Sequence, residues 1–187
     1  MKRIIEIRWH GRGGQGAWTA SELLAKAAVY EGKYIQSFPE FGPERMGAPV
    51  TAFTRISFEP IKLHCAIYNP DVVVVLDQTL MKTVPVAEGL SEDGKIVVNS
   101  KDSPLEIKQR LGVVDRVEVW TVPATEIAVK ILRAPITSTA MLGAVARATG
   151  IVSLESIKRT VEERFRRDIA EKNFAVIEES YREARST

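Results

Sequence analysis

Cysteine is almost absent from this chain: Cys65 is the single one in 187 residues. One thiol can form no disulfide within the chain, and it cannot supply the several thiolates that an iron-sulfur cluster or a cysteine-ligated zinc site needs. Histidine is nearly as scarce, with His10 and His64 alone. The sequence therefore excludes these cysteine-based sites, offers little for acid-base catalysis, and indicates a cytoplasmic location.

An excess of charge is also lacking. The 26 lysines and arginines face 24 aspartates and glutamates, which gives a formal net charge of +2 without a dense basic block. Nucleic-acid-binding proteins concentrate positive charge far more strongly. No apolar run approaches membrane-spanning length. Glu6 and Arg8 interrupt the first apolar run, so it does not have the pattern of a signal peptide. We therefore expect neither nucleic acid nor a membrane as a partner.

Strand-like and helix-like segments alternate along a chain that is 45% hydrophobic, enough for one buried core. Residues 72–76 form a continuous apolar run, which is typical of a strand buried on both faces of a parallel sheet. We expect a single α/β domain over residues 1–187. Its predicted form is an open, mostly parallel, Rossmann-like sheet with helices on both faces and a helical C-terminal region.

Hydrophobic periodicity and turn residues divide the chain into elements. Strands are predicted at 4–9, 33–38, 50–58, 72–76, 94–99 and 116–122. Helices are predicted at 17–30, 104–111, 123–132 and 138–149, with one broken helix or two consecutive ones over 157–185. Pro39 is expected to end the second strand, residues 61–65 to form a hairpin with 50–58, and residues 184–187 to fray.

The most distinctive stretch is a glycine-rich turn, His10-Gly11-Arg12-Gly13-Gly14-Gln15-Gly16, between the first predicted strand and the first predicted helix. Glycines permit positive φ and a close approach by a ligand, and the start of a helix favours an anion. The Gly11-x-Gly13-x-x-Gly16 spacing satisfies the dinucleotide fingerprint. We interpret the turn as a phosphate site to which Arg12 adds a positive charge. The alternative is that the glycines serve only a tight turn and close packing.

A second loop, residues 39–49, holds three prolines and two glycines. It leaves the carboxyl end of the second predicted strand, so we expect it at the same sheet edge as the glycine turn. Glu40, Glu44 and Arg45 are its candidate contacts for a ligand or a partner chain, unless a Glu-Arg pair only holds the loop. Its apolar Phe41 and Met46 favour a surface between subunits.

Candidates for catalysis are few. His10 lies beside the glycine turn, where it either contacts a ligand or ends the strand. His64 and Cys65 are neighbours in a predicted strand, so their side chains point to opposite faces and form no dyad. Asp77, at the carboxyl end of the buried strand, is expected to cap the next helix or to reach a ligand. We therefore predict no catalytic residue and no metal site in this chain.

The glycine turn and the stretch from Phe41 to Val50, Phe-Gly-Pro-Glu-Arg-Met-Gly-Ala-Pro-Val, together resemble the gamma subunit, or fused gamma domain, of the 2-oxoacid:ferredoxin oxidoreductases. The pyruvate enzyme is the most similar. The resemblance covers essentially the whole chain, including the valine-rich strand that ends in Asp77-Gln78. In one departure, Met46 stands where members usually carry an arginine.

This resemblance implies a gamma subunit of pyruvate:ferredoxin oxidoreductase, which converts pyruvate and coenzyme A into acetyl-CoA, CO2 and reduced ferredoxin. It implies that thiamine diphosphate, Mg²⁺ and iron-sulfur clusters belong to the alpha, beta and delta partner subunits, and that this chain alone is inactive. Coenzyme A is the implied co-substrate near this chain. Its implied contacts are Gly11, Arg12, Gly13, Gly14, Gln15, Gly16, Glu44 and Arg45.

Three alternatives remain open from the sequence. A gamma subunit of a related oxidoreductase, for instance of a branched-chain 2-oxoacid, fits the same motifs. A stand-alone NAD(P)-dependent dehydrogenase is favoured by Glu40, 24 residues past Gly16, where an acidic residue would bind an adenosine ribose. Against the dehydrogenase, Gly14-Gln15 is not typical of its turn and no catalytic histidine or tyrosine-lysine pair stands out. The third alternative is an interaction scaffold with an empty turn.

Overall fold

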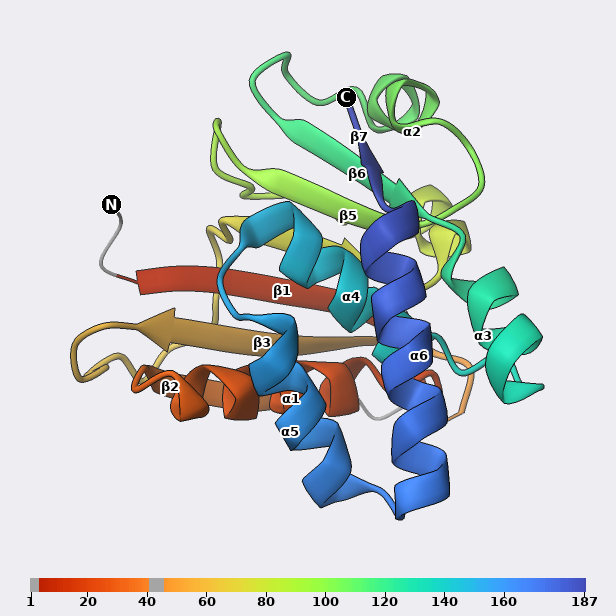
Figure 1. The fold of residues 1–187 in the computed structure, drawn as a ribbon. Coiled ribbons are helices and arrows are strands. Elements are labelled where there is room, and N and C mark those ends of the chain that lie inside the picture. The colour runs from red at the N-terminus through yellow and green to blue at the C-terminus, as the bar shows by residue number, and fades with distance from the viewer. Residues whose placement is uncertain (1–3, 41–45) are drawn as a thin grey trace.

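The computed structural model describes residues 4–40 and 46–187. These residues form one seven-stranded sheet in the order β2-β3-β1-β4-β5-β6-β7 (Figure 1). The strands are β1 (Ile4–Arg12), β2 (Tyr34–Glu40), β3 (Pro49–Ser57), β4 (Val72–Val75), β5 (Lys95–Asn99), β6 (Glu118–Val122) and β7 (Arg185–Ser186). The helices are α1 (Ala17–Tyr30), the 3₁₀ helix η1 (Gln78–Lys82), α2 (Pro104–Leu111), α3 (Ala124–Leu132), α4 (Thr137–Thr149), α5 (Leu154–Arg164) and α6 (Arg167–Glu183).

Parallel pairing joins β1, β4, β5 and β6 at the centre of the sheet. Side chains of β4 alternate between two apolar cores: Val72 and Val74 face the larger core, which contains α1 and α3–α6, and Val73 and Val75 face the smaller one, which contains α2 and η1. All four valines are buried. The predicted α/β fold, with a mostly parallel sheet, helices on both faces and a helical C-terminal region, is confirmed.

The neighbours of β3 were predicted wrongly. We expected β3 to pair with residues 61–65, but it lies between β1 and β2 and runs antiparallel to both. The predicted hairpin with residues 61–65 is absent from the described chain because both edges of β3 are already paired. Pro39 does not end β2, since β2 is an edge strand whose outer N–H groups need no ladder partner.

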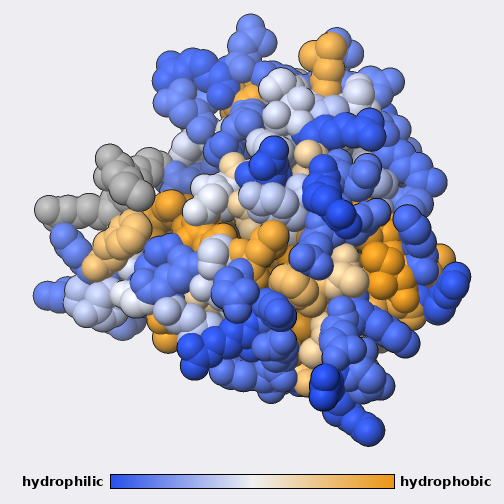
Figure 2. Space-filling view, viewed as in Figure 1, coloured by the Kyte–Doolittle hydropathy of each residue, from blue (hydrophilic) through white to orange (hydrophobic). Residues whose placement is uncertain are grey.

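The C-terminal region is built on a close contact between α4 and α6. A Cβ atom at Gly143 would lie 2.1 Å from the backbone oxygen of Ile177, so the two helices touch there. The prediction that residues 184–187 fray is wrong: β7 pairs with β6, and Thr187 N donates to Val119 O. Side chains over α5 and α6 are mostly hydrophilic on the face that Figure 2 shows. Within the described ranges no helix is long and apolar enough to cross a membrane.

Candidate ligand-binding cleft

A cleft of about 1100 Å³ lies at the carboxyl edge of the parallel strands. It is lined by the glycine turn, by the chain following β4 and β5, and by the first residues of α3 and α4. The second loop reaches the same edge, because Gly13 N donates to Ala48 O at 2.8 Å and Gly47 N donates to Gly13 O at 3.1 Å. The predicted meeting of the two loops at one sheet edge is confirmed for their described residues.

The glycine turn is closed by one glutamine. Arg12 N donates to Gln15 Oε1 at 2.7 Å, and Gln15 N donates to Arg12 O at 2.9 Å. Gly14 and Gly16 have φ values of 93° and 77°, in a region that residues with a Cβ atom rarely adopt. A Cβ at Gly14 would also lie 3.1 Å from the side chain of Met46. The glycines thus serve both the turn and close packing, while Gly13, Gly14 and Gly16 also line the cleft.

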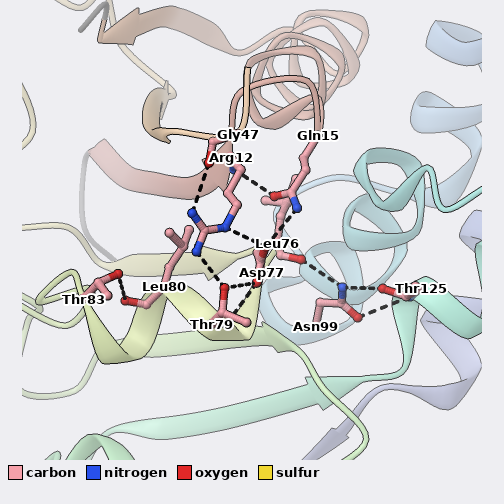
Figure 3. Close-up of polar contacts among 10 residues, drawn as sticks. All are labelled: Arg12, Gln15, Gly47, Leu76, Asp77, Thr79, Leu80, Thr83, Asn99 and Thr125. Carbon is pink, nitrogen blue, oxygen red and sulfur yellow. Dashed lines mark hydrogen bonds and ion pairs between the residues drawn. The ribbon is translucent and has the colours of Figure 1, made fainter. Parts of the chain in front are cut away.

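Arg12 is held by the protein itself (Figure 3). Its guanidinium donates to Asp77 Oδ2 at 3.1 Å, Gly47 O at 3.0 Å and Thr79 Oγ1 at 2.8 Å. Gln15 Nε2 donates to the same Asp77 oxygen at 3.0 Å. The sequence predicted an added positive charge at the turn. The structure pairs that charge with Asp77, which lines the cleft, whereas Gly11 and Arg12 are not among the lining residues.

Asp77 caps η1, one of the two roles that the sequence left open. Its Oδ1 accepts from Thr79 N at 2.9 Å. Burial opposes ionisation of the carboxyl, but hydrogen bonds from Thr79 and Gln15 and the charge of Arg12 outweigh burial and hold the pKa of Asp77 below its usual value. Asp77 is therefore ionised at neutral pH and holds Arg12 by an ion pair.

Asn99 is a residue of this cleft that the sequence analysis did not single out. Its Nδ2 donates to Leu76 O and to Thr125 Oγ1, both at 2.9 Å, and its Oδ1 accepts from Thr125 N at 3.2 Å (Figure 3). One amide thus joins the ends of β4 and β5 to the start of α3. Its place at the carboxyl end of a predicted parallel strand was the signal that would have found it.

His10 lies in the sheet and not in the cleft. It is 6% exposed, and Arg8 Nε donates to its Nε2 at 3.1 Å. Burial, together with the charge of Arg8, lowers the pKa of His10 to about 4. His10 is therefore a neutral histidine at physiological pH, and of the two roles considered the structural one fits.

Glu40, His64 and Cys65 line a different pocket, of about 450 Å³, next to the buried Arg55. The dehydrogenase alternative needs Glu40 beside the glycine turn, and Glu40 does not line the cleft. His64 and Cys65 lie outside any strand, so the premise used to exclude a dyad was wrong.

Glu44 and Arg45 fall outside the described residues, as does Phe41, so their predicted contacts stay predictions. In the part of the chain that is described, no group of three or more His, Cys, Asp or Glu side chains is placed to hold a metal ion.

Comparison with known proteins gives a family match over residues 6–183, to the family described as pyruvate ferredoxin/flavodoxin oxidoreductase. The chain is 52% identical over 178 residues to the pyruvate/ketoisovalerate oxidoreductases common subunit gamma of Pyrococcus abyssi, which covers 95% of this chain and 96% of that one. It is 49% identical over 180 residues to pyruvate synthase subunit PorC of Methanocaldococcus jannaschii, covering 96% and 97%.

Two solved structures also match this chain. The pyruvate oxidoreductase subunit PORC of Thermotoga maritima matches with a TM-score of 0.88 and 42% identity, over 100% of this chain and 99% of that one. A 2-oxoglutarate:ferredoxin oxidoreductase from Magnetococcus marinus, solved with 2-oxoglutarate, coenzyme A and succinyl-CoA bound, matches with a TM-score of 0.75. At 18% identity, over 96% of this chain and 31% of that one, the second match indicates a shared fold.

Proposed function

Because this chain belongs to the pyruvate ferredoxin/flavodoxin oxidoreductase family, as a gamma subunit of pyruvate synthase, we propose that its cleft forms the coenzyme A side of the assembled active site. The resemblance recognised from the two sequence motifs is confirmed by these relatives. The role of the cleft goes beyond them and is our proposal.

One observation carries the proposal: the glycine turn and the start of α1 lie at a large cleft at the carboxyl edge of the sheet. Ligands of open α/β sheets bind outside this edge, and a helix start attracts phosphate. Coenzyme A carries a diphosphate and a ribose phosphate. The shared fold with an enzyme that was solved with coenzyme A bound supports the choice of ligand.

The contribution of this chain to the reaction is binding and orientation. Backbone N–H groups of the glycine turn would hold phosphate oxygens, and Arg12 would add charge through whichever N–H groups a ligand draws away from Gly47 and Thr79. Holding the nucleotide end would direct the thiol toward the site where the acyl group forms. No side chain of this chain is assigned a proton-transfer step.

Partner subunits would supply the remaining chemistry. As the resemblance implies, thiamine diphosphate, Mg²⁺ and the iron-sulfur clusters belong to alpha, beta and delta subunits, through which electrons reach ferredoxin. The scarcity of thiols here supports that division, because an iron-sulfur cluster needs several. Met46, 84% exposed at the rim of the cleft, supports the interpretation of residues 39–49 as part of an interface.

Pyruvate is the 2-oxoacid that we propose. A second candidate is a subunit shared between a pyruvate enzyme and a ketoisovalerate enzyme, which the name of the Pyrococcus abyssi relative favours. Purifying the native complexes through this chain and identifying every other subunit would separate one assembly from two.

The coenzyme A role is tested in the reconstituted complex by titrating coenzyme A at saturating pyruvate. We expect Arg12→Ala to raise the KM for coenzyme A about tenfold, the effect of losing one charge-assisted contact, with little change in the KM for pyruvate. The control is Arg116→Ala, which removes an exposed arginine paired with Asp93 outside the cleft. An unaltered coenzyme A titration for Arg12→Ala would show that the turn serves packing alone.

A further inference from the structure

Two helices that begin at the cleft have open N-termini. Neither α1 nor α4 has a side-chain cap or an acidic residue in its first turn. By contrast, α3 begins at the same cleft with Thr125 N bound to Asn99 and with Glu126 in its first turn. The first N–H groups of a helix lack intrahelical partners, so α1 and α4 direct such donors and the positive ends of two macrodipoles toward the cleft.

The two open helix starts lie against each other. A Cβ atom at Gly16, the residue before α1, would lie 3.0 Å from Cβ and 3.1 Å from Oγ of Ser138, in the first turn of α4. Gly16 has φ 77°, so it is the residue type that both the backbone angle and the contact require. The donors of both helices therefore open into one region of the cleft and not into two separate sites.

A second, independent observation at α4 is a buried hydroxyl without a partner. Thr137 lines the cleft, is 5% exposed, and its Oγ1 is buried without a hydrogen-bond partner. Buried hydroxyl groups in proteins nearly always have a partner, and a ligand oxygen would provide one. Ser138, which also lines the cleft, is equally buried and adds a second hydroxyl.

The acidic residues of the cleft do not oppose an anion, since each is paired with a cation. Asp77 is paired with Arg12, Asp102 with Arg110 and Glu126 with Lys101. Arg164 also lines the cleft and adds positive charge. The electrostatics of the region therefore favour a ligand with more than one negative charge.

We propose that the N-termini of α1 and α4 form a single cradle for the diphosphate of coenzyme A, with the hydroxyls of Thr137 and Ser138 as additional donors. The inference rests on the proposed function and extends it from the glycine turn to a helix more than a hundred residues away. Two adjacent helix starts match two linked phosphate groups, whereas a single phosphate needs one.

The first experiment places a charge in the cradle of the reconstituted complex. Ser138→Asp is compared with Ser138→Asn, which has nearly the same size without the charge, using coenzyme A, dephospho-coenzyme A and pantetheine as acyl acceptors. We expect Ser138→Asp to raise the KM at least tenfold over Ser138→Asn for both diphosphate-bearing acceptors and to leave the KM for pantetheine unchanged. Equal KM values for the two variants with dephospho-coenzyme A would overturn the proposal.

The second experiment removes the unpartnered hydroxyl. Thr137→Val should raise the KM for coenzyme A several-fold without lowering the melting temperature of the full chain, because that hydroxyl has no protein partner to lose. The control is Thr160→Val, whose buried hydroxyl donates to Ser156 O away from the cleft, and which should leave the KM unchanged. An unchanged KM for Thr137→Val would overturn the proposal. This test remains available if Ser138→Asp fails to fold.

These outcomes separate the cradle from the function on which it rests. If Arg12→Ala weakens coenzyme A while the Ser138 and Thr137 variants do not, the cradle is wrong and the coenzyme A role of the glycine turn stands. If none of the three changes the coenzyme A titration, both fail. Inorganic diphosphate tests the cradle with a probe that is not itself an acyl acceptor: it should compete with coenzyme A in the wild type and more weakly in Ser138→Asp.

Discussion

The ion pair between Arg12 and Asp77 affects the charge that the glycine turn would present to an anion. Arg12 compensates the charge of Asp77, which lines the cleft, so removing Arg12 would leave a carboxylate without its cation beside the ligand. Part of the loss in coenzyme A affinity expected for Arg12→Ala is therefore repulsion by Asp77 and not a missing contact.

This repulsion gives the first prediction at the residue scale. In the assembled enzyme, Arg12→Ala with Asp77→Asn should have a lower KM for coenzyme A than Arg12→Ala alone, because the amide keeps the size of the carboxylate without its charge. The two single variants and the double variant form a double-mutant cycle. Equal KM values for Arg12→Ala and the double variant would show that Asp77 does not repel the ligand.

His10 gives the second prediction, on stability against pH. Its pKa is about 4 in the folded chain and about 6.5 in the unfolded chain, so the unfolded state takes up the proton first as the pH falls. The stabilising contribution is complete above pH 6.5 and is lost between pH 6.5 and 4, by about 3 kcal/mol at most.

Urea unfolding of the chain at pH 7 and pH 4.5 measures this contribution. The difference in free energy of unfolding between the two pH values should be smaller in His10→Gln than in the wild type, by about 2 to 3 kcal/mol. Comparing the two pH values within each variant removes the cost of the substitution itself. An equal pH dependence in both proteins would contradict a neutral, buried His10.

At the scale of elements, the contact between α4 and α6 depends on a glycine without a Cβ. Gly143→Ala would place its methyl 2.1 Å from the backbone oxygen of Ile177, and backbone cannot yield as a flexible side chain can. We expect the substitution to lower the free energy of unfolding by about 3 kcal/mol, at the upper end of overpacking effects.

The control for this contact is Gly112→Ala at the end of α2. Gly112 has φ 62°, and a Cβ atom there would point into open space with nothing within 4 Å, so the cost is backbone strain alone, about 1 to 2 kcal/mol. Urea denaturation of both variants gives the comparison. A smaller loss for Gly143→Ala than for Gly112→Ala would mean that the helices separate at little cost.

Local signals predicted elements well, and distant pairing was the part that the sequence did not reveal. The helix predicted over 104–111 has the bounds of α2. Its start and end depend on nearby residues alone: Ser103 and Glu106 form a capping box, and Gly112 ends the helix. The position of β3 between β1 and β2 depends on partners far along the chain, which no local pattern specifies. The antiparallel β7 was missed for the same reason.

The candidate site divides in the same way. The glycine turn, Gln15 and Asp77 were singled out because their residue types and places at strand ends are visible in the sequence. Asn99, Thr137 and the contact between Gly16 and Ser138 were not, since each depends on how α3 and α4 pack. The pairing of Arg12 with Asp77 likewise needed the sheet order that brings β1 beside β4.

At the scale of the whole molecule, this chain should fold alone but catalyse nothing alone. It has one cysteine and no proton-transfer residue assigned to it, so we expect both electron transfer and decarboxylation to depend on partner subunits. Pyruvate-dependent viologen reduction should be absent for the purified chain and present for the reconstituted complex. Turnover by the purified chain would contradict the division of chemistry that we propose.

The central claim is that the cleft of this subunit holds the phosphate groups of coenzyme A. Amide hydrogen exchange of the assembled oxidoreductase, with and without coenzyme A, tests it most directly because the proposed donors are backbone N–H groups. Exchange should slow at residues 13–19 and 137–139 when coenzyme A binds, and should not slow at the first turn of α5, which begins away from the cleft with its own cap from Ser153. Unchanged exchange in both cleft segments, with protection by coenzyme A confined to other subunits, would contradict the account.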